Sequence, residues 1–492
     1  MASTETTSSN KKLRVLLIPF FASSHIGPFT ELAVSLATAR PHAVEATVAV
    51  TPANASIVRS LLQRHENGGT PAQVATYPFP AVDGLPRGVE NLGAAAQADA
   101  WRIDVAALSD ALMRPVQETL IRAQSPDALV TDVHFMWNAD VCDELGVPCV
   151  TYNVVGAFST LAMRHLTLAL VSNSNTNIEP EPEAVSVPRF PAPEIRVPTV
   201  ELPEYLRSQE RVDYSTYNRL YEVQGDCFGV AVNTSLDLEE HYCEMYAGNG
   251  YAKRAYMLGP LSLRLPSSPE AGDSRYTDWL DSKPSRSVVY VCFGSLAHVS
   301  DAQLDELALG LEASGMAFLW VVRADKWSPP ERWHERVGGR GMVATAWAPQ
   351  RAILAHRAVG AFVTHCGWNS VLETVAAGVP VLTWPIVFEQ FITERLLTEV
   401  LGIGERLWPD GAGVRSTRHE EQEVIPAQYV VRALTTFMQP GGPGDAARSR
   451  VMDLSARVHA AVAEGGSSDR DLHRLIDDLM EAAAAAARRT TM

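Results

Sequence analysis

Residues 347–390 read WAPQRAILAHRAVGAFVTHCGWNSVLETVAAGVPVLTWPIVFEQ, and this stretch decides the fold. Its segment Val359–Thr364 is short, apolar and rich in β-formers, which predicts a buried parallel strand. A turn over residues 365–368 follows, and Asn369 is placed to cap a helix over 370–377. A strand, a glycine turn and a helix N-terminus together predict an anion site, because free N–H groups and the positive end of the helix dipole face the turn.

Polar and aromatic side chains in the same stretch suit a nucleotide-sugar. Side-chain donors for phosphate oxygens stand at the turn, namely His365, Asn369 and Ser370. On the helix, Glu373 can accept both hydroxyls of a ribose, as an acidic residue does in dinucleotide folds. Trp347 offers a flat face for a base, and Glu389 and Gln390 follow the next strand, where they can bond sugar hydroxyls. An ordinary βα unit of a core needs a glycine turn and a cap, but not this combination.

The stretch closely resembles the signature box of plant family-1 UDP-glycosyltransferases and matches its length without an insertion. The resemblance implies a GT-B fold, in which two facing Rossmann-like, doubly wound α/β domains hold the active site in the cleft between them. It also implies that Gln390, at the end of the box, accompanies UDP-glucose. The implied donor-binding positions are Ser295, Trp347, Ala348, Gln350, His365, Gly367, Trp368, Asn369, Ser370, Glu373, Glu389 and Gln390.

In the N-terminal half, two polar residues stand at the carboxyl ends of expected strands. His25 follows a strand over 14–20 and precedes a helix whose first turn holds Pro28, and Asp132 ends a strand over 128–131. Ligand crevices of open α/β sheets lie at such ends. An Asp held against one imidazole nitrogen fixes the tautomer and leaves the other nitrogen as a general base. We therefore expect His25 and Asp132 to meet.

The family resemblance extends to these segments. PFFASSHIGPFTELA looks like the segment that carries the catalytic base of the family, and DALVTDVHFMWNADVCDELGVP looks like the segment that carries its Asp partner. One position departs from the pattern, because Ser24 stands where relatives commonly have glycine. The resemblance thus implies that His25 and Asp132 are the catalytic pair. It covers the chain from about Val15 to Met480.

Walls of an acceptor pocket are harder to identify, because apolar residues are mostly core. The candidates lie in or beside expected loops and are His134, Phe135, Trp137 and Phe158. A pocket wall and a core contact are equally good interpretations of each. The proline-rich segment 179–204 is expected to be irregular, either as a rim over the pocket or as a surface excursion. The segments GLPRGVENL, FGVAVNTSLDLE and RAYMLGPLSL look like a branch of the family that acts on flavonoids, terpenoids and other phenols, and a phenolic hydroxyl is favoured.

Composition bounds the remaining properties. With 492 residues, 46% of them hydrophobic, the chain is expected to fold as two domains. A net charge of −16 argues against nucleic acid and anionic membrane surfaces as partners. The six Cys show no CxxC spacing, no signal peptide is apparent, and no apolar run reaches the length of a membrane span. We expect a cytoplasmic monomer that uses UDP-glucose and a small apolar acceptor, with no cofactor and no metal.

The expected organisation has five parts. They are a disordered tail over 1–12, an acceptor-binding domain over 13–258, a linker over 259–273, a UDP-sugar-binding domain over 274–465, and a terminal helix over 466–492 that the family resemblance returns to the first domain. A D-x-D triplet, Asp469 to Asp471, lies far from any expected crevice and is interpreted as solvated charge rather than a metal site.

Two other functions stay open at this point. A non-catalytic binding protein could keep the same fold and hold a small apolar ligand. Such a protein would have no need of His25, Asp132 and the donor stretch all together. A glycoside hydrolase would need a pair of carboxylates astride the bond, and no such pair is identified. The sequence has no G-x-G-x-x-G after a strand, no G-x-S-x-G and no P-loop, so nothing favours a dehydrogenase, a serine hydrolase or a P-loop NTPase.

Overall fold

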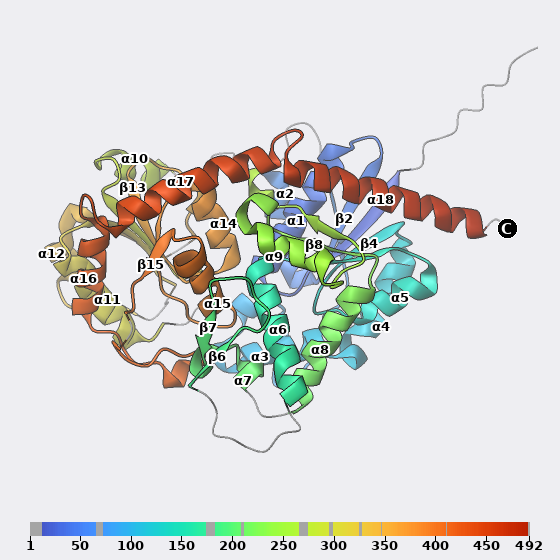
Figure 1. Cartoon of the computed structure of the whole chain (residues 1–492), viewed down its shortest axis with the longest axis horizontal. Coiled ribbons are helices and arrows are strands. Elements are labelled where there is room, and N and C mark those ends of the chain that lie inside the picture. Colours follow the sequence, from blue (N-terminus) through green and yellow to red (C-terminus); the bar gives the residue numbers. More distant parts are fainter. Residues whose placement is uncertain are drawn as a thin grey trace, which may run out of the picture.

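Two parallel sheets organise the protein (Figure 1). The computed structural model describes residues 12–64, 72–173, 183–207, 211–264, 274–294, 299–323, 327–345, 347–409 and 411–490. The first sheet has the order β3-β2-β1-β4-β5-β8-β9, and every pairing in it is parallel. Its strands are β1 Leu13–Ile18, β2 Val44–Val50, β3 Gln73–Thr76, β4 Ala128–Asp132, β5 Cys149–Asn153, β8 Gly229–Val232 and β9 Ala255–Met257.

The second sheet is also parallel and has the order β12-β11-β10-β13-β14-β15. Its strands are β10 Val288–Cys292, β11 Ala317–Val321, β12 Gly341–Ala344, β13 Val359–Thr364, β14 Val381–Thr383 and β15 Gly404–Arg406. The strand order reverses between β1 and β4 in the first sheet and between β10 and β13 in the second. Ligands of open α/β sheets bind at such switch points, outside the carboxyl ends of the strands.

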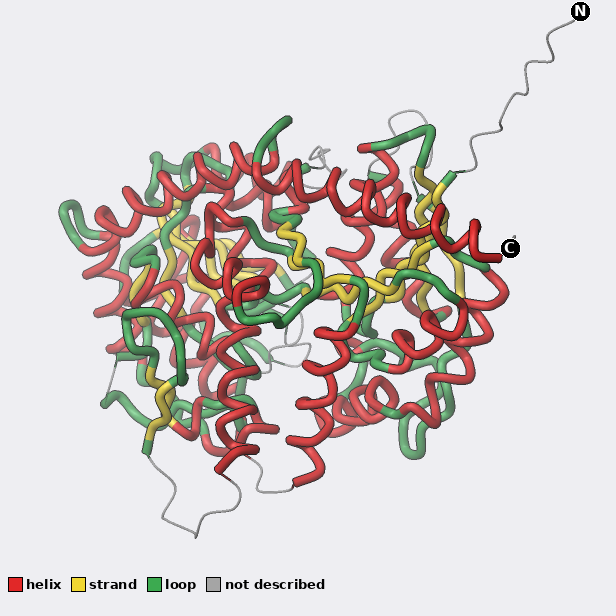
Figure 2. Tube along the Cα trace, turned by 45° about the vertical axis from the view of Figure 1, so that its right-hand side comes forward, coloured by secondary structure: helices red, strands yellow, loops and turns green. Residues whose placement is uncertain are grey.

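Helices flank both sheets, so the strands lie inside a helical shell (Figure 2). The helices of the first half are α1 Ser23–Ala39, α2 Ala55–Gln63, α3 Ala100–Leu108, α4 Asp110–Gln124, α5 Trp137–Leu145, α6 Ala157–Asn173, α7 Glu204–Arg207, α8 Arg211–Asp226 and α9 Leu236–Gly248. Those of the second half are α10 Ser274–Asp281, α11 Asp301–Ala313, α12 Trp333–Val337, α13 Gln350–Leu354, α14 Trp368–Ala377, α15 Gln390–Arg395, α16 Ala427–Met438, α17 Pro443–Val462 and α18 Ser467–Thr490. Continuous apolar runs such as β13 become strands because helices cover both faces.

The expected elements are largely confirmed, with shifts at their ends. The strand Val359–Thr364 has the predicted bounds. The side chain of Ser109 caps α4, so α3 and α4 are separate helices. The predicted domain ranges 13–258 and 274–465 contain one of the two parallel sheets each, and the first also contains a two-stranded antiparallel sheet of β6 (Ala184–Ser186) and β7 (Arg196–Pro198). Most of the expected linker, residues 265–273, and nearly all of the expected tail, residues 1–11, lie outside the described residues.

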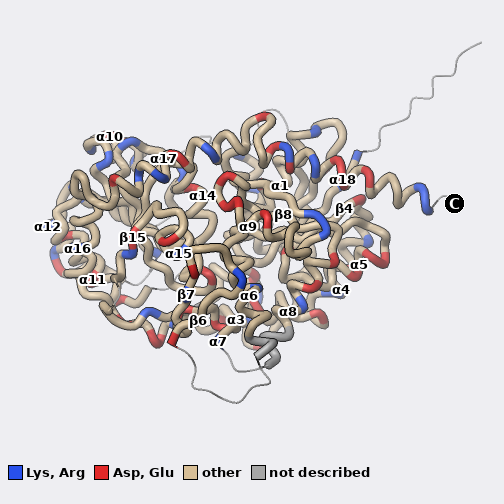
Figure 3. Tube along the Cα trace, in the orientation of Figure 1, with Lys and Arg blue, Asp and Glu red and all other residues tan. Residues whose placement is uncertain are grey.

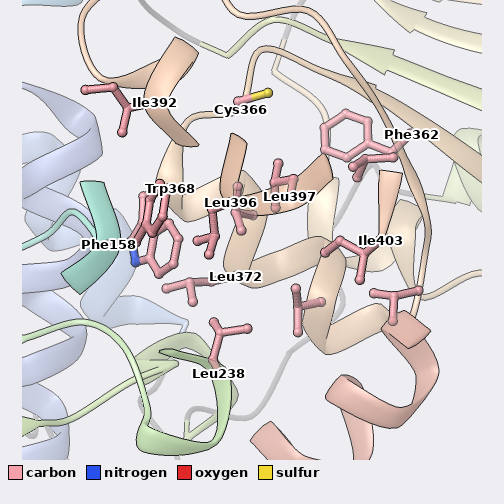
Figure 4. Packing of buried hydrophobic residues seen from close by; sticks show 14 of the residues in the cluster. Phe158, Leu238, Phe362, Cys366, Trp368, Leu372, Ile392, Leu396, Leu397 and Ile403 are labelled. Carbon is pink, nitrogen blue, oxygen red and sulfur yellow. The ribbon is translucent and has the colours of Figure 1, made fainter. Parts of the chain in front are cut away.

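One apolar cluster joins the two halves. Phe158 of α6 and Leu238 of α9 belong to the same buried cluster as Trp368 and Leu372 of α14, and Figure 4 shows the Trp368 ring beside Phe158. The chain has no Cβ at Gly156, where one would lie 2.5 Å from the Trp368 ring. The two sheets therefore share a packed interface rather than a linker alone.

The terminal helix α18 returns to the first sheet (Figure 1). Asp471 accepts a hydrogen bond from the backbone N–H of Met257 at 2.7 Å, and Asp469 pairs with Arg264 at 3.1 Å. The interpretation of these two aspartates as solvated charge is therefore wrong, because both anchor α18 to the end of the first domain.

Charged residues of both signs are interspersed over both halves in the view of Figure 3. A nucleic-acid-binding surface would instead gather Lys and Arg on one face. Among the described residues, no helix combines the length and the apolar character that crossing a membrane requires.

Candidate active site

His25 and Asp132 meet at the switch point of the first sheet. Asp132 ends β4, and its Oδ2 lies 2.8 Å from Nδ1 of His25. The Asp132 side chain is fully buried, and the N–H of Phe20 donates to the same oxygen at 3.1 Å. The helix expected to begin after His25 begins before it, at Ser23, so His25 lies in the first turn of α1. The histidine is thus held by a helix on one side and by a buried carboxylate on the other.

A second imidazole shares this carboxylate. Nδ1 of His134 lies 2.6 Å from Oδ1 of Asp132, and the backbone N–H of His134 donates to the same oxygen at 3.3 Å. Burial would raise the pKa of Asp132, but the charges and hydrogen bonds of His25 and His134 outweigh it and hold that pKa well below its usual range. Burial also opposes the charge on His134, yet Asp132 and Asp104 raise its pKa overall. Sequence reasoning placed His134 in the acceptor wall and missed this contact.

The other three candidates for the acceptor wall, for which pocket and core were equally good interpretations, are buried among core residues. Phe135 is packed between Phe21 and Trp137, and all three rings are buried. The Trp137 indole N–H donates to Gln117 at 2.8 Å, so its polar edge is already satisfied. Phe158 is fully buried in the cluster between the two halves. The apolar character of these residues serves packing.

The turn between β13 and α14 has the expected strand–turn–helix form but not the expected cap. The helix begins at Trp368 with Gly367 as its N-cap residue, and no side chain caps it. Asn369 therefore lies inside the first turn, and the prediction that it caps the helix is wrong. Its Nδ2 donates to the backbone oxygen of Ser24 at 2.9 Å. The first N–H groups of α14 have no partners inside the helix and stay available to an anion.

His365 stands at this turn with one nitrogen unsatisfied. Its Nδ1 is buried and has no hydrogen-bond partner among the described residues. Burial lowers the pKa of His365 to about 4, so the ring is neutral at physiological pH. Gly294 and Gly367 pack on the ring, and a Cβ at Gly294 would come within 2.6 Å of it. A buried, unpartnered ring nitrogen beside a helix N-terminus is suited to a phosphate.

Gln350 links the polar residues of α14. Its side-chain N–H groups donate to Ser370 at 2.9 Å and to Glu373 at 2.7 Å, and its oxygen accepts from Tyr290 at 3.2 Å. Burial raises the pKa of Glu373, with the bond from Gln350 opposing it. Glu373 is therefore a desolvated carboxylate with room for further donors, as a ribose site requires.

Trp347 has the exposed face that a base would need. It is 49% exposed, and the guanidinium of Arg64, at the end of α2, lies 5.0 Å from its ring centroid. Ala348, next to it, is buried. Sequence reasoning missed Arg64, since nothing local marks a cation that reaches across from the other half of the chain.

The remaining donor-binding residues differ in which of their polar atoms are available to a ligand. Glu389 is buried, and desolvation raises the pKa of its carboxyl to about 7. The side-chain oxygen of Gln390 accepts from the N–H groups of Ile386 and Val387, so its amide N–H₂ is the end left for a ligand. The Trp368 indole N–H donates to the backbone oxygen of Asn233 in the first half at 2.7 Å, so this side chain serves the interface. Ser295 lies outside the described residues.

Three neighbouring groups could hold a metal ion among the described residues, namely His25, Asp132 and His134. Both imidazoles face the carboxylate at hydrogen-bond distance, which suits proton transfer without a metal. Metal independence stays a prediction.

Comparisons with known proteins agree with this geometry. The family model described as UDP-glucoronosyl and UDP-glucosyl transferase matches residues 270–403. UDP-glucose flavonoid 3-O-glucosyltransferase 7 of Fragaria ananassa is 33% identical, over 97% of this chain and 98% of its own length. Scopoletin glucosyltransferase of Nicotiana tabacum is 33% identical, over 95% and 98%. A Glycyrrhiza uralensis protein, crystallised with glycyrrhetinic acid 3-O-monoglucuronide, superposes with a TM-score of 0.85 at 30% identity, over 98% of both chains.

Relatives of this similarity, matched over nearly their whole length, carry the family assignment, and the two parallel sheets match the fold of the solved relative. The chain belongs to the plant family-1 UDP-glycosyltransferases and is a glycosyltransferase of GT-B fold.

Proposed function

We propose that the protein transfers glucose from UDP-glucose to a hydroxyl of a small apolar plant metabolite, giving a β-O-glycoside. The observation that carries this proposal is the pairing of His25 with the buried Asp132, one residue away from the Ser24–Asn369 bond to the donor turn. Base and donor turn are thereby held next to each other.

In the proposed mechanism, Asp132 keeps the hydrogen of His25 on Nδ1, so Nε2 faces the acceptor as a base. The acceptor oxygen forms a bond to the anomeric carbon as its proton passes to Nε2. The bond from that carbon to the phosphate oxygen breaks, and UDP leaves with the electron pair. Attack opposite the leaving group turns an α-linked donor into a β-glycoside. General base catalysis of this kind contributes about 10²–10⁴-fold.

On the donor side, the leaving diphosphate binds the N–H groups at the start of α14 and the free nitrogen of His365. Glu373 accepts the ribose hydroxyls, and Trp347 stacks on the base. Glu389 and the amide N–H₂ of Gln390 bind hydroxyls of the sugar, with glucose favoured by Gln390.

The acceptor is an O-nucleophile of the phenolic class, with flavonoids first and terpenoids next. Two relatives support this order, because their names state a flavonoid and scopoletin as acceptors. We also propose that the protein is a cytoplasmic monomer that needs no metal. Gel filtration tests whether it is a monomer, and an activity assay with a chelator present tests whether it needs a metal.

The experiment is a product screen by mass spectrometry. The protein meets UDP-glucose, a chelator and a panel of flavonols, simple phenols and terpenoid alcohols. We expect hexosylated products from the wild type and at least a hundredfold less from His25→Ala. His459→Ala is the matched control, since His459 is an exposed histidine of α17 whose ring bonds the Ala376 carbonyl, far from His25 in the sequence.

The outcomes separate glycosyl transfer from the non-catalytic binding that the sequence left open. Binding of UDP without product from any acceptor, with UDP-glucose, UDP-galactose or UDP-glucuronate, would favour a binding protein. Equal activity in His25→Ala and the wild type would refute the role of His25.

A further inference from the structure

Asp132 holds the imidazoles of His25 and His134 so that each ring carries hydrogen on Nδ1. An ionised carboxylate only accepts hydrogen bonds, and each of its oxygens faces a different Nδ1, from His25 at 2.8 Å and from His134 at 2.6 Å. Both Nδ1 atoms therefore carry hydrogen. Asp132 and Asp104 raise the pKa of His134, so at alkaline pH, where the rings are neutral, both Nε2 atoms hold a free lone pair.

The Nε2 edges of the two rings are the edges turned away from Asp132. The Asp132 side chain is fully buried, whereas the His25 and His134 side chains are 17% and 20% exposed. Their ring centroids lie 5.6 Å apart, and Phe20 contacts both rings, at 5.0 Å and 4.5 Å. Because Nδ1 faces the buried carboxylate, Nε2 lies on the opposite edge of each ring.

We propose that His134 binds a second acceptor hydroxyl beside the one that reacts, so that the site selects acceptors with two neighbouring hydroxyls, as in catechols and vicinal diols. This inference rests on the proposed function. A phenylalanine at position 134 could also pack on Phe20. It would lack the hydrogen bond to Asp132 and the Nε2 atom that His134 provides.

The reaction is unchanged by this arrangement. One hydroxyl gives its proton to Nε2 of His25 as its oxygen bonds to the anomeric carbon and UDP departs with the electron pair. The second hydroxyl keeps its proton and donates it in a hydrogen bond to Nε2 of His134. The second hydroxyl therefore orients the acceptor, and His134 acts on selectivity rather than on the proton transfer.

The test compares three small acceptors that differ at one position: catechol, 2-methoxyphenol, in which the second oxygen has no hydrogen, and phenol. We expect wild-type kcat/KM to be about 3–10-fold higher for catechol than for 2-methoxyphenol, after correction for two equivalent hydroxyls, which is the size of one net hydrogen bond. His134→Phe should bring this ratio to about one while transfer to phenol continues.

A second variant, His134→Gln, distinguishes the loss of a hydrogen bond from a folding defect. In His134→Gln, the amide N–H can still donate to Asp132 while the amide oxygen accepts a hydroxyl, so part of the catechol preference should return. His165→Phe is the matched control, because His165 is a buried histidine whose Nδ1 bonds the Pro188 carbonyl and which does not touch Asp132. Thermal unfolding of each variant reports its folding.

Each outcome decides. If the wild type glycosylates none of the acceptors in the wider panel, the proposed function itself has failed. If the wild type is active and the catechol ratio is the same in His134→Phe, the inference is overturned and the function stands. Equal loss for all three acceptors would make His134 a support of His25 only, and loss of the preference in a chelator would mean that a metal bridges the hydroxyls. Both results also overturn the inference.

Discussion

Asn369 donates its side-chain N–H to the backbone oxygen of Ser24 at 2.9 Å, across the two halves of the molecule. Ser24 lies in the first turn of α1, and the residue four positions on is Pro28, which has no N–H to donate. The Ser24 oxygen therefore lacks its helical partner, and Asn369 supplies one. A residue of the donor turn thus holds the residue that precedes His25.

We expect Asn369→Ala to lower kcat by about 3–10-fold, the range of one net hydrogen bond, because the first turn of α1 loses its contact with the donor turn. UDP affinity, measured by calorimetry, should change little. A change in UDP affinity with kcat unchanged would mean that Asn369 acts on the donor instead.

The controls use the same chemistry. Asn218→Ala removes an asparagine that bonds Glu222 on the exposed side of α8 and should leave kcat unchanged. Pro28→Ala supplies an N–H for the Ser24 oxygen inside α1 but no contact with the donor turn, so it should not recover the activity when added to Asn369→Ala.

We predict that the protein takes up a proton at His365 when UDP binds. Burial holds the pKa of His365 at about 4, so the ring of the free protein is neutral at pH 5.5 and above. A diphosphate beside Nδ1 favours the charged ring and raises that pKa. We expect UDP binding at pH 5.5 to take up more protons in the wild type than in His365→Gln, and the difference to vanish above pH 7.5.

Calorimetry in buffers of different ionisation enthalpy measures this uptake. Subtracting the His365→Gln value removes the contribution of the UDP phosphate, which titrates near pH 6. His459→Gln should behave as the wild type. Proton uptake that is the same in His365→Gln and the wild type would contradict a phosphate contact at this ring.

The sequence predicted elements and motif positions well, because these depend on local pattern. The strand Val359–Thr364, the helix after it and the meeting of His25 with Asp132 follow from apolar runs and from the rule that ligands gather at carboxyl ends of parallel strands. What failed depends on partners far along the chain. Asn369 reads as a cap locally, yet Ser24, distant in sequence, takes its donor.

Apolar residues gave the least information. Phe135 and Phe158 carry the same signal whether they line a pocket or fill a core, and the structure puts both in cores. His134 looked like another wall residue, because an imidazole two positions after an aspartate has no local pattern that predicts a shared carboxylate.

We predict that the Glu389 carboxylate lowers the stability of the protein at high pH while it strengthens binding of the donor. Burial raises the pKa of its carboxyl to about 7, above the value of 4.5 expected in the unfolded chain. The folded state therefore holds the proton more tightly, and this contribution to stability is present below pH 4.5 and lost as pH rises through 7. Glu389→Gln should be more stable than the wild type at pH 8, by up to about 3 kcal/mol, and equally stable at pH 4.

The same variant should bind UDP-glucose less well, because a carboxylate accepts sugar hydroxyls more strongly than an amide. Thermal unfolding at both pH values and the KM for UDP-glucose measure the two effects. Equal unfolding temperatures of the two proteins at pH 8 would show that the carboxyl titrates normally.

A buried ionic network ties the proline-rich segment to the second half of the chain. Glu201, in the turn after β7 (Arg196–Pro198), bonds Arg395 at 2.6 Å and Arg415 at 2.8 Å, and all three side chains are at most 8% exposed. Glu394 also faces Arg415. The segment is therefore more than a surface excursion, since it is locked to the C-terminal half.

We expect Glu201→Ala to destabilise the protein by about 3–5 kcal/mol, because two buried guanidinium groups lose a carboxylate partner that water cannot replace. Arg395 is then left to backbone oxygens and Arg415 to Glu394. Glu335→Ala is the matched control. It breaks a pair with Arg332 of similar length, 2.8 Å, but both of those side chains are largely exposed, so its cost should be under about 1 kcal/mol. Urea unfolding compares the two variants with the wild type. If the two cost the same, water reaches the Glu201 network, and the segment is not held by buried charge.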